Sequence, residues 1–301
     1  MRVFVTGASG HVGSAVIPEL LGAGHEVVGL ARSGESAAAV TATGAKVLRG
    51  SLDDLDVLRE AAIGADGVIH LAFKHEAMRA GDFDGAISAD LLALETLSEA
   101  LAGSGKPLVS TSGTLMLTFA GLNRVATETD VVEAGPRVDA ENGVIAMAER
   151  GVRSSVVRLP PTVHSPLDHH GYIPTLIAIA RDKGSASYVG EGSNRWPAGH
   201  TLDAARLYRL ALESAPAGTR LHAVGDEGIP FRQIAETIGR RLDIPVTSIP
   251  TEEADAYFGF LSLFVQLDNP TSSALTQELL GWQPTHPGLI EDLDQGHYFN
   301  G

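Results

Sequence analysis

The order of apolar and polar residues divides the first half of the chain into short apolar runs and longer amphipathic segments. The runs are rich in β-branched residues, which is typical of strands buried on both faces of a parallel sheet. The segments between them place apolar residues at helical spacing, as Val12, Val16 and Leu20 do. This alternation predicts an α/β fold with a doubly wound parallel sheet. The predicted strands are 2–6, 27–31, 46–49, 66–72, 107–111 and 156–160.

After about residue 166 the alternation of strands and helices loosens. We expect this part to form a smaller α+β region that is partly interleaved with the main sheet. The apolar stretch from Tyr257 to Leu267 is too short to span a bilayer. It is a candidate pocket lid or subunit contact, with a buried core helix as an equal alternative. The predicted elements are helices at 173–183, 200–213 and 231–242, strands at 187–189, 221–225 and 245–250, and a loop at 190–199.

Three glycines follow the first predicted strand directly and open the first predicted helix. Gly7, Gly10 and Gly13 are spaced G-x-x-G-x-x-G. Such glycines allow a tight turn, a close approach to a pyrophosphate and close packing of helix on strand. The N–H groups at the start of the helix favour phosphate oxygens. The pattern therefore predicts a dinucleotide site.

With the threonine before it, the segment TGASGHVG resembles the extended and atypical short-chain dehydrogenase/reductases, often called the NAD-dependent epimerase/dehydratase group. The stretches 66–72 (DGVIHLA), 156–160 (VVRLP) and 279–284 (LLGWQP) resemble further motifs of this group, and the likeness extends over essentially the whole chain. The resemblance implies a Rossmann-type domain over 1–165 and a substrate region over 166–301. It also implies a cofactor site formed by Gly7, Ser9, Gly10, His11, Val12, Gly13, Ser51, Leu52, Leu71, Ala72, Thr111, Arg137, Pro160 and Val163.

The end of the second predicted strand indicates which dinucleotide binds. An acidic residue there favours the ribose 2′-hydroxyl of NAD, whereas an arginine accommodates the 2′-phosphate of NADP. Arg32 and Ser33 follow this strand, and no acidic residue ends it. We predict NADP as the cofactor, with a solvated surface role for Arg32 as the alternative. Asp53 is expected to cap the helix that follows the third strand.

The chain departs from the family at the expected catalytic centre. The family places a serine or threonine after the fifth strand, and Gly113 stands at that place, between Ser112 and Thr114. Either hydroxyl would hold a substrate carbonyl. Glu133 and Arg137 stand at the places of the family's Tyr-x-x-x-Lys, and a spacing of four predicts one helix face for both. Glu133 is a poor proton donor at neutral pH, because a free glutamate has a pKa of about 4.3.

Other residues could supply the proton that the family's tyrosine usually gives. His164, just past the sixth strand, and Tyr172 are candidates, and Ser112 or Thr114 could relay a proton from water. His164 could instead form a pocket wall without transferring a proton. We expect the substrate pocket to include Phe73, Gly113, His164, Tyr172 and Trp196. His164, Asp168, His169 and His170 could be read as metal ligands, but hydride transfer needs no metal and we predict none.

Composition narrows the class of protein. The chain has 301 residues, 44% of them hydrophobic and 20% charged, as in an ordinary soluble globular protein. Its formal charge of −15 argues against a nucleic acid as partner. It has no cysteine, which excludes disulfides and thiolate chemistry. We expect a cytoplasmic protein without a membrane segment, and a homodimer is a candidate assembly.

These observations favour an NADP(H)-dependent oxidoreductase that reduces a ketone or aldehyde. We expect a small or apolar carbonyl substrate rather than a sugar nucleotide, because the second half of the chain lacks a cluster of basic residues. An inactive NADP-binding sensor is the first alternative, supported by the missing tyrosine and lysine. An epimerase or dehydratase is the second.

Overall fold

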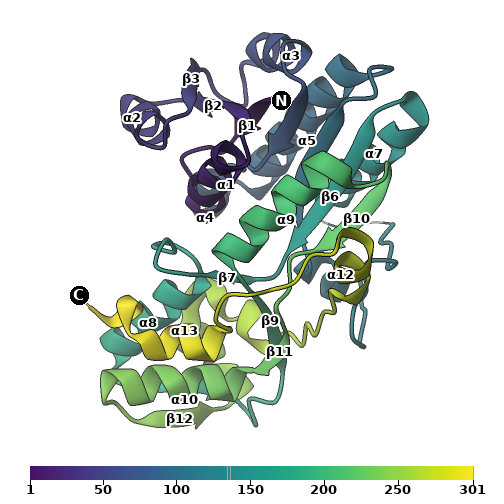
Figure 1. Cartoon of the computed structure of the whole chain (residues 1–301). Coiled ribbons are helices and arrows are strands. Elements are labelled where there is room, and N and C mark those ends of the chain that lie inside the picture. Colours follow the sequence, from purple (N-terminus) through teal and green to yellow (C-terminus); the bar gives the residue numbers. More distant parts are fainter. Residues whose placement is uncertain (134, 136, 301) are drawn as a thin grey trace.

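A sheet of seven parallel strands forms the first structural unit (Figure 1). The computed structural model describes residues 1–133, 135 and 137–300. The strand order is β10-β6-β5-β4-β1-β2-β3, which is a doubly wound Rossmann arrangement and confirms the predicted fold class. The strands are β1 (Arg2–Thr6), β2 (Glu26–Ala31), β3 (Lys46–Arg49), β4 (Gly67–His70), β5 (Pro107–Gly113), β6 (Arg153–Leu159) and β10 (Thr219–His222).

The central strands of this sheet are buried on both faces, which explains the apolar residues of β1, β2 and β4. In β1 the side chains alternate, so Val3 and Val5 pack into one core cluster and Phe4 into the other. One cluster includes residues of α1 (His11–Gly22), α2 (Gly34–Ala42) and α9 (Thr201–Ser214). The opposite cluster includes residues of α3 (Leu55–Ile63), α5 (Phe83–Leu101) and α7 (Val138–Ala146).

A second unit lies below the carboxyl ends of these strands in the view of Figure 1. Its core contains the buried side chains of Trp196, Phe231 and Leu289. A three-stranded sheet has the order β11-β9-β7, and β8 pairs with β12 in parallel. The elements are β7 (Thr162–His164), α8 (Tyr172–Lys183), β8 (Ala186–Val189), β9 (Arg195–His200), β11 (Asp226–Pro230), α10 (Phe231–Leu242), β12 (Val246–Ile249), α11 (Ala254–Phe258) and α13 (Leu289–Gln295).

Strand β9 corrects part of the prediction, because it covers residues 195–199 of the expected loop and His200, which was expected to begin the next helix. Trp196 and Ala198 are both buried, but Pro197 and Gly199 stand between and after them and hide the strand signal. The smaller elements are α4 (His75–Arg79), α6 (Leu115–Phe119), α12 (Ala274–Leu280) and the short 3₁₀ turns η1 (Met147–Arg150), η2 (Thr251–Glu253), η3 (Gly259–Leu261), η4 (Phe264–Gln266) and η5 (His297–Phe299).

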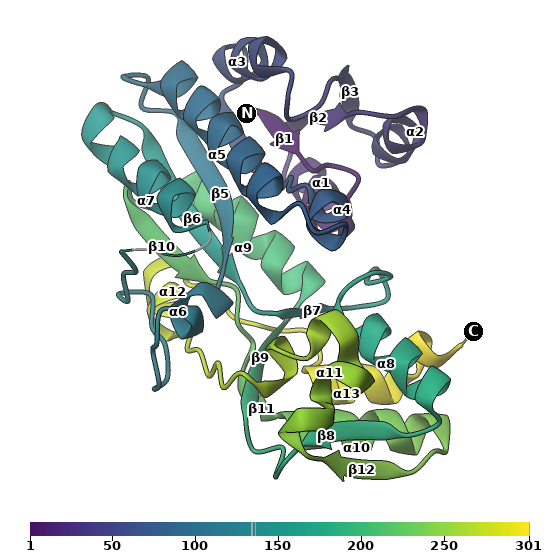
Figure 2. The ribbon, with the colours of Figure 1, turned by 180° about the vertical axis from the view of Figure 1, so that it is seen from behind.

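The chain passes between the two units more than once. Helix α9 and strand β10 return from the second unit to complete the main sheet and its core, as the view from behind also shows (Figure 2). Trp282, from the LLGWQP stretch, is buried in the first core and donates from Nε1 to the Asp203 carbonyl oxygen at 2.9 Å. The predicted interleaving therefore involves α9, β10 and the Trp282 segment.

The apolar stretch from Tyr257 to Leu267 is broken into α11 and two 3₁₀ turns rather than forming one helix. Leu261 and Val265 are buried, whereas Phe260 and Leu263 are more than half exposed. The described part of the chain contains no helix of the length and apolarity needed to cross a bilayer.

Candidate functional site: the carboxyl edge of the main sheet

The glycine turn after β1 is packed so closely that side chains are excluded. Gly7 has a φ of +67°, in the left-handed region. A Cβ on Gly7 would lie 2.7 Å from the backbone nitrogen of Ala72, and one on Gly13 would lie 2.9 Å from the carbonyl carbon and oxygen of Ala8. Gly7 thus lets the turn pack against the segment that follows β4, and Gly13 lets the first turn of α1 pack against the glycine turn itself.

The start of α1 offers backbone donors that no side chain occupies. Gly10 is the N-cap residue of this helix and makes no side-chain capping hydrogen bond, and Ser9 and Gly10 are exposed. The turn follows β1, which lies between β4 and β2 where the strand order reverses. In doubly wound sheets, ligands bind outside the strand ends at this point. The residues present fit a dinucleotide pyrophosphate.

Two arginines lie together at the ends of β2 and β3. Arg32 follows β2, and its guanidinium, which is 64% exposed, donates to a Glu76 carboxylate oxygen at 2.8 Å. Arg49 ends β3 opposite Ala31 and donates to the carbonyl oxygens of Ser33 at 2.5 Å and Arg32 at 3.2 Å. The sequence analysis missed Arg49. The signal was available, because neighbouring parallel strands end side by side.

The polar side chains of the loop after β3 are engaged in hydrogen bonds with protein partners. Ser51 donates from its backbone nitrogen and from its hydroxyl to the Asp54 carboxylate, at 2.7 and 2.9 Å, while Leu52 is buried. The prediction that Asp53 caps α3 is wrong, since Asp54 occupies the N-cap position without a side-chain capping bond. Asp53 instead accepts hydrogen bonds from Lys74 at 2.7 and 2.8 Å.

Strands β4 and β5 end in a buried polar network. His70 bonds Thr6 through Nδ1 at 2.9 Å and Asp90 through Nε2 at 3.2 Å, and its side chain is fully buried. The Thr111 hydroxyl donates to the His70 carbonyl oxygen at 2.8 Å and lies 2.7 Å from the Tyr208 hydroxyl. Burial raises the pKa of Tyr208 well above its ordinary value. Thr111 is only partly buried, whereas the Ser112 and Thr114 hydroxyls after it on the chain are buried.

Arg137 reaches this network from just outside a helix. The predicted shared helix face for Glu133 and Arg137 is wrong, because α7 begins at Val138 and Arg137 is left-handed with a φ of +63°. Its guanidinium lies 3.0 Å from the Asp90 carboxylate, donates to the Thr111 carbonyl oxygen at 3.0 Å, and sits 4.3 Å from the centre of the Phe73 ring.

The charge of Arg137 is matched by Asp90. Burial opposes ionisation of this carboxyl, but the neighbouring Arg137 guanidinium and the hydrogen bond from His70 outweigh it and lower the pKa of Asp90. Arg137 is thus a fixed cation at the ends of β4 and β5. The sequence analysis did not identify Asp90, which sits within α5 and carries no motif.

The two hydroxyls predicted to hold the substrate carbonyl lie below the surface. Ser112 is 5% exposed and donates to the Met116 sulfur at 2.9 Å. Thr114 is fully buried and donates to Asn269 Oδ1 at 2.7 Å. Gly113, between them, is half-buried. Either hydroxyl would have to leave its present partner to reach a substrate, so their catalytic role stays a prediction.

The predicted proton donors lie in the second unit. His164 is buried and bonds Asp292 through Nδ1 at 2.8 Å, while its Nε2 has no hydrogen-bond partner. Tyr172 packs against Phe264 and Trp196, both 5.6 Å away between ring centres, and burial raises its pKa to about 12. Trp196 is fully buried and donates from Nε1 to the Phe264 carbonyl oxygen, so it belongs to the core.

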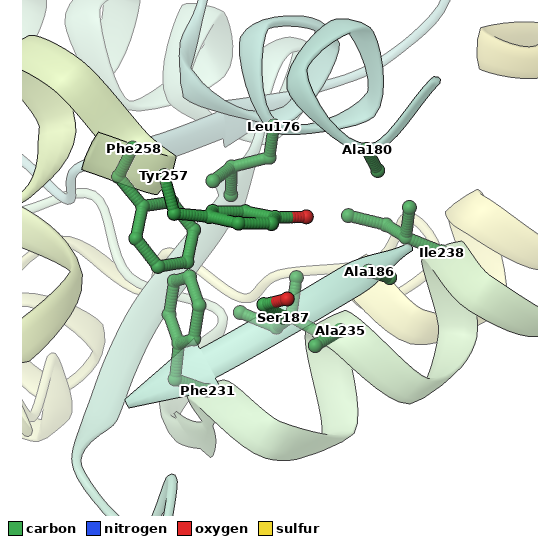
Figure 3. A pocket seen from close by; sticks show the side chains of 10 residues that line it. Leu176, Ala180, Ala186, Ser187, Phe231, Ala235, Ile238, Tyr257 and Phe258 are labelled. Atoms are coloured by element: carbon green, nitrogen blue, oxygen red, sulfur yellow. The ribbon is translucent and has the colours of Figure 1, made fainter. Parts of the chain in front are cut away.

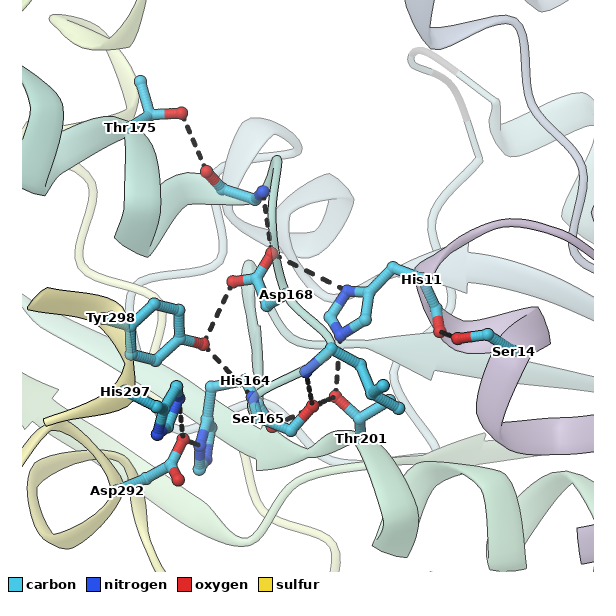
Figure 4. Close-up of polar contacts among 12 residues, drawn as sticks. His11, Ser14, His164, Ser165, Asp168, Thr175, Thr201, Asp292, His297 and Tyr298 are labelled. Atoms are coloured by element: carbon cyan, nitrogen blue, oxygen red, sulfur yellow. Dashed lines mark hydrogen bonds and ion pairs between the residues drawn. The ribbon is translucent and has the colours of Figure 1, made fainter. Parts of the chain in front are cut away.

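His11 connects the glycine turn to the second unit (Figure 4). Its Nε2 lies 2.8 Å from the Thr201 hydroxyl, and its Nδ1 lies 3.8 Å from the Asp168 carboxylate. Burial, together with the nearby histidines, lowers the pKa of His11 to about 4. Asp168 accepts from Tyr298 at 3.2 Å, and Ser165 donates to Thr201 at 2.8 Å. The ring is therefore neutral at pH 7 and acts as a hydrogen-bonding contact between the units.

The histidines do not form a good metal site in the described residues. His164 and Asp168 bond other partners, as above. His200, Asp203 and His286 lie close enough to share an ion. However, the rings of His200 and His286 are stacked at 4.6 Å and 9°, so their in-plane lone pairs cannot point to one ion. Asp203 accepts instead from the backbone nitrogens of Thr285 and His286.

A small apolar cavity in the second unit is unsuited to a substrate. It lies between α8, β8, α10 and α11, lined by side chains that include Leu176, Phe231, Ile238 and Tyr257 (Figure 3). Its volume of about 10 Å³ is room for at most one water molecule. A larger hollow of about 180 Å³ lies beside α6, against residues 130–132.

Comparisons with known proteins agree with this geometry. Residues 3–131 match the model of the NAD dependent epimerase/dehydratase family. An uncharacterized protein of Schizosaccharomyces pombe is 48% identical over 301 residues, which cover 99% of this chain and 100% of the relative. The chain belongs to this family. This family belongs to the short-chain dehydrogenase/reductase superfamily of enzymes.

A more distant relative is named as a reductase, and a solved structure bound to a sugar nucleotide shares the fold. The 2-alkyl-3-oxoalkanoate reductase of Stenotrophomonas maltophilia is 26% identical, over 79% of this chain and 74% of its own. A solved structure of MoeE5 in complex with UDP-glucose and NAD has a TM-score of 0.77 and 21% identity, and covers 99% of this chain and 97% of that one. The likeness to MoeE5 shows the shared fold alone.

Within the family, the cofactor edge of this chain is regular and the catalytic centre is not. The predicted cofactor residues Leu71 and Ala72 follow β4, while Pro160 and Val163 lie at the end of β6 and in β7. Leu71, Ala72 and Pro160 therefore follow the carboxyl ends of β4 and β6, whereas Val163 lies within β7 of the second unit. That they bind a cofactor stays a prediction. At the places predicted for the family's tyrosine and lysine, Glu133 is exposed and Arg137 is already bound to Asp90.

Proposed function

We propose that this protein is an NADP(H)-dependent oxidoreductase that reduces the ketone or aldehyde group of a small or apolar substrate. The observation that carries the proposal is the pair of arginines beside the glycine turn, Arg32 and Arg49. A bound dihydronicotinamide supplies the hydride for the new C–H bond, and a proton completes the alcohol O–H bond.

The arginine pair supports NADP over NAD. A guanidinium offers a planar set of donors that matches a phosphate. Arg49 is held by two backbone carbonyl groups, and Arg32 is exposed and close to it. The first residue after β2 is thus a cation, where NAD-preferring enzymes have a carboxylate.

Arg137 is suited to orient the nicotinamide ribose. Its Nε and Nη2 groups donate to Asp90 and to the Thr111 carbonyl oxygen. These contacts leave Nη1 as the group that would reach a ribose hydroxyl. Arginine keeps its charge at neutral pH, so this cation could replace the family's lysine as a ribose ligand. It could not replace the tyrosine as an acid.

Aromatic side chains lie where α6 meets the second unit, and two arginines of that unit are already engaged. Phe119 is 43% exposed, and its ring centre lies 6.1 Å from that of Phe264. Arg195 donates to Asp268 through its backbone nitrogen, Nε and Nη2, and Arg181 donates to the Phe299 carbonyl oxygen. These arginines are already engaged, which supports an apolar substrate over one with a diphosphate. Two relatives at 26% and 27% identity are named as an oxoalkanoate reductase and a ketoreductase.

Two of the predicted proton donors have a group that could serve a substrate: a protonated phenol in Tyr172 and an unpartnered ring nitrogen in His164. Tyr172 remains protonated across the neutral range because its pKa is about 12. His164 has an unpartnered Nε2 inside the second unit. We propose that one of these groups, or a water held by a hydroxyl of β5, protonates the carbonyl oxygen.

The test is NADPH oxidation, followed at 340 nm, with ketones and aldehydes of increasing chain length. We expect turnover with NADPH in preference to NADH and higher kcat/KM for longer apolar substrates. Phe119→Ala should lower that chain-length preference, with Phe83→Ala, an exposed phenylalanine on α5, as the control. Loss of turnover in His164→Phe or Tyr172→Phe, with NADPH binding unchanged, would identify the donor.

A cofactor-binding sensor is the second candidate function. It is favoured by one observation: Glu133, at the place predicted for the family's tyrosine, is an exposed carboxylate outside any helix. Tight NADPH binding with no turnover of any carbonyl substrate would contradict the reductase proposal and favour the sensor.

A further inference from the structure

Two ion pairs cross the sheet edge where the adenosine half of a dinucleotide would lie. Arg32, after β2, pairs with Glu76 of α4 at 2.8 Å. Asp53, after β3, pairs with Lys74 at 2.7 Å. The strand order β4-β1-β2-β3 places β1 between β4 and the other two strands. The segment after β4 is therefore tied to the loops after β2 and β3, across the glycine turn that follows β1.

The proposed function places the 2′-phosphate of NADP at Arg32, which in this structure already binds a carboxylate. A phosphate and the Glu76 carboxylate would compete for the same guanidinium donors. Arg49 differs, because it donates to the carbonyl groups of Ser33 and Arg32 and braces the loop. Arg32 is therefore the arginine at this edge that can exchange its carboxylate partner for a phosphate.

We propose that Glu76 is a specificity-determining residue, which occupies Arg32 in the free enzyme and yields it to the 2′-phosphate of NADP. This inference rests on the proposed use of NADP. An NAD ribose carries a neutral 2′-hydroxyl and leaves the Arg32–Glu76 pair in place. Breaking the Arg32–Glu76 pair costs free energy when NADP binds but not when NAD binds. Glu76 therefore lowers the affinity for NADP and the preference for NADP over NAD.

The exposure of the pair makes the exchange feasible. The side chains of Arg32 and Glu76 are 64% and 74% exposed. Such pairs are weak and screened by salt, because water competes for both charges. A phosphate carries more charge than a carboxylate and binds a guanidinium through two parallel hydrogen bonds. The phosphate should therefore displace Glu76, and the cost of displacement should fall as salt is added.

The experiment measures dissociation constants of NADPH and NADH for the full chain and three variants. We expect Glu76→Gln to tighten NADPH binding by about two- to fivefold, the range for an exposed ion pair, and to leave NADH unchanged. Arg32→Gln should weaken NADPH binding by about tenfold or more, the effect of losing hydrogen bonds to a charged group. Glu35→Gln is the matched control, since it removes an equal exposed charge three residues from Arg32 without contacting it.

The double variant Arg32→Gln/Glu76→Gln separates the proposed exchange from general repulsion. If Glu76 acts through Arg32, its replacement has no effect once Arg32 is gone. An unchanged benefit in the double variant, or an equal benefit from Glu35→Gln, would overturn the inference. If the parent instead binds NADH as well as NADPH and Arg32→Gln changes neither, the proposed use of NADP fails. NADPH preference that depends on Arg32 but not on Glu76 overturns this inference alone.

Discussion

Gly13 should resist replacement by alanine more strongly than helix propensity suggests. It lies in the first turn of α1 with an ordinary backbone conformation, so alanine there would gain about 1 kcal/mol from propensity. Against this, the new Cβ would lie 2.9 Å from the carbonyl carbon and oxygen of Ala8 and closer still to the carbonyl oxygen of Gly7. Backbone atoms cannot rotate away as a side chain end can.

The contact should decide the outcome. Overpacking costs about 1–3 kcal/mol, and the upper part of this range applies when backbone must shift. After the gain from propensity, we expect Gly13→Ala to lower the free energy of unfolding by about 2 kcal/mol. The same shift would move the glycine turn away from the start of α1, so NADPH binding should weaken as well.

Gly22→Ala provides a control in the same helix. Gly22 is the last residue of α1, it is exposed, and a Cβ there would meet no atom within 4 Å. We expect this variant to match the parent or to gain a few tenths of a kcal/mol. Urea unfolding followed by circular dichroism gives both free energies, and cofactor titration gives the binding constants. A Gly13→Ala protein as stable as Gly22→Ala, with unchanged NADPH binding, would refute the reasoning.

Other predictions concern buried charge. Glu141→Gln should cost about 3 kcal/mol in urea unfolding, because it leaves the fully buried Arg158 without its carboxylate 2.5 Å away. Glu99→Gln, in an exposed pair, should leave the unfolding curve almost unchanged, and equal losses of stability in the two variants would contradict this reasoning. Burial lowers the pKa of His11 and of His200 to about 4, below the ordinary 6.5. Unfolding releases these rings to bind protons, so stability should be full above pH 6.5 and fall by about 1–2 kcal/mol as pH drops toward 4, after allowing for solvent screening. His11→Asn should reduce the loss of stability between pH 6.5 and pH 4. A parent protein that is equally stable at pH 7 and pH 4.5 would argue against this role of the two histidines.

The parts of the fold that were predictable are those where one local signal dominates. The run 2–6 is apolar on both faces because β1 lies between two other strands and under helices on each side. Gly7, with a positive φ, and Gly13, whose Cβ would overlap backbone atoms, each answer a steric demand that other residues do not meet. The sequence records both constraints directly, so strand, turn and helix could be placed within a residue or two.

The start of α7 was missed because its cause is not local. The spacing of Glu133 and Arg137 is helical, yet Arg137 is left-handed and its guanidinium binds Asp90, 47 residues away. A long-range ion pair of this kind leaves no pattern near Arg137 in the sequence. Strand β9 was missed for a different reason, since its proline and glycine are typical of loops.

The candidate catalytic centre was the least predictable part. The residue types at 112 and 114 were read as reactive hydroxyls. Thr114 is held by Asn269, 155 residues along the chain, which no local pattern reveals, and the bond of Ser112 to Met116 forms only because β5 turns directly into α6. Arg49 and Glu76 were overlooked because each gains a role only through the position of Arg32 across the sheet edge. Side-chain chemistry can be read from a sequence, whereas the partner that modifies it depends on the fold.

The return of α9, β10 and Trp282 to the main sheet bears on how the chain can fold during its synthesis. A nascent chain that has reached residue 165 has made six strands of the main sheet, but β6 then forms an open edge because β10 is its outer neighbour. The face that α9 and Trp282 will cover is also exposed to water at that stage. Open edges and uncovered apolar faces invite association with other chains. We therefore expect the N-terminal part to need chaperone protection until about residue 282 has left the ribosome.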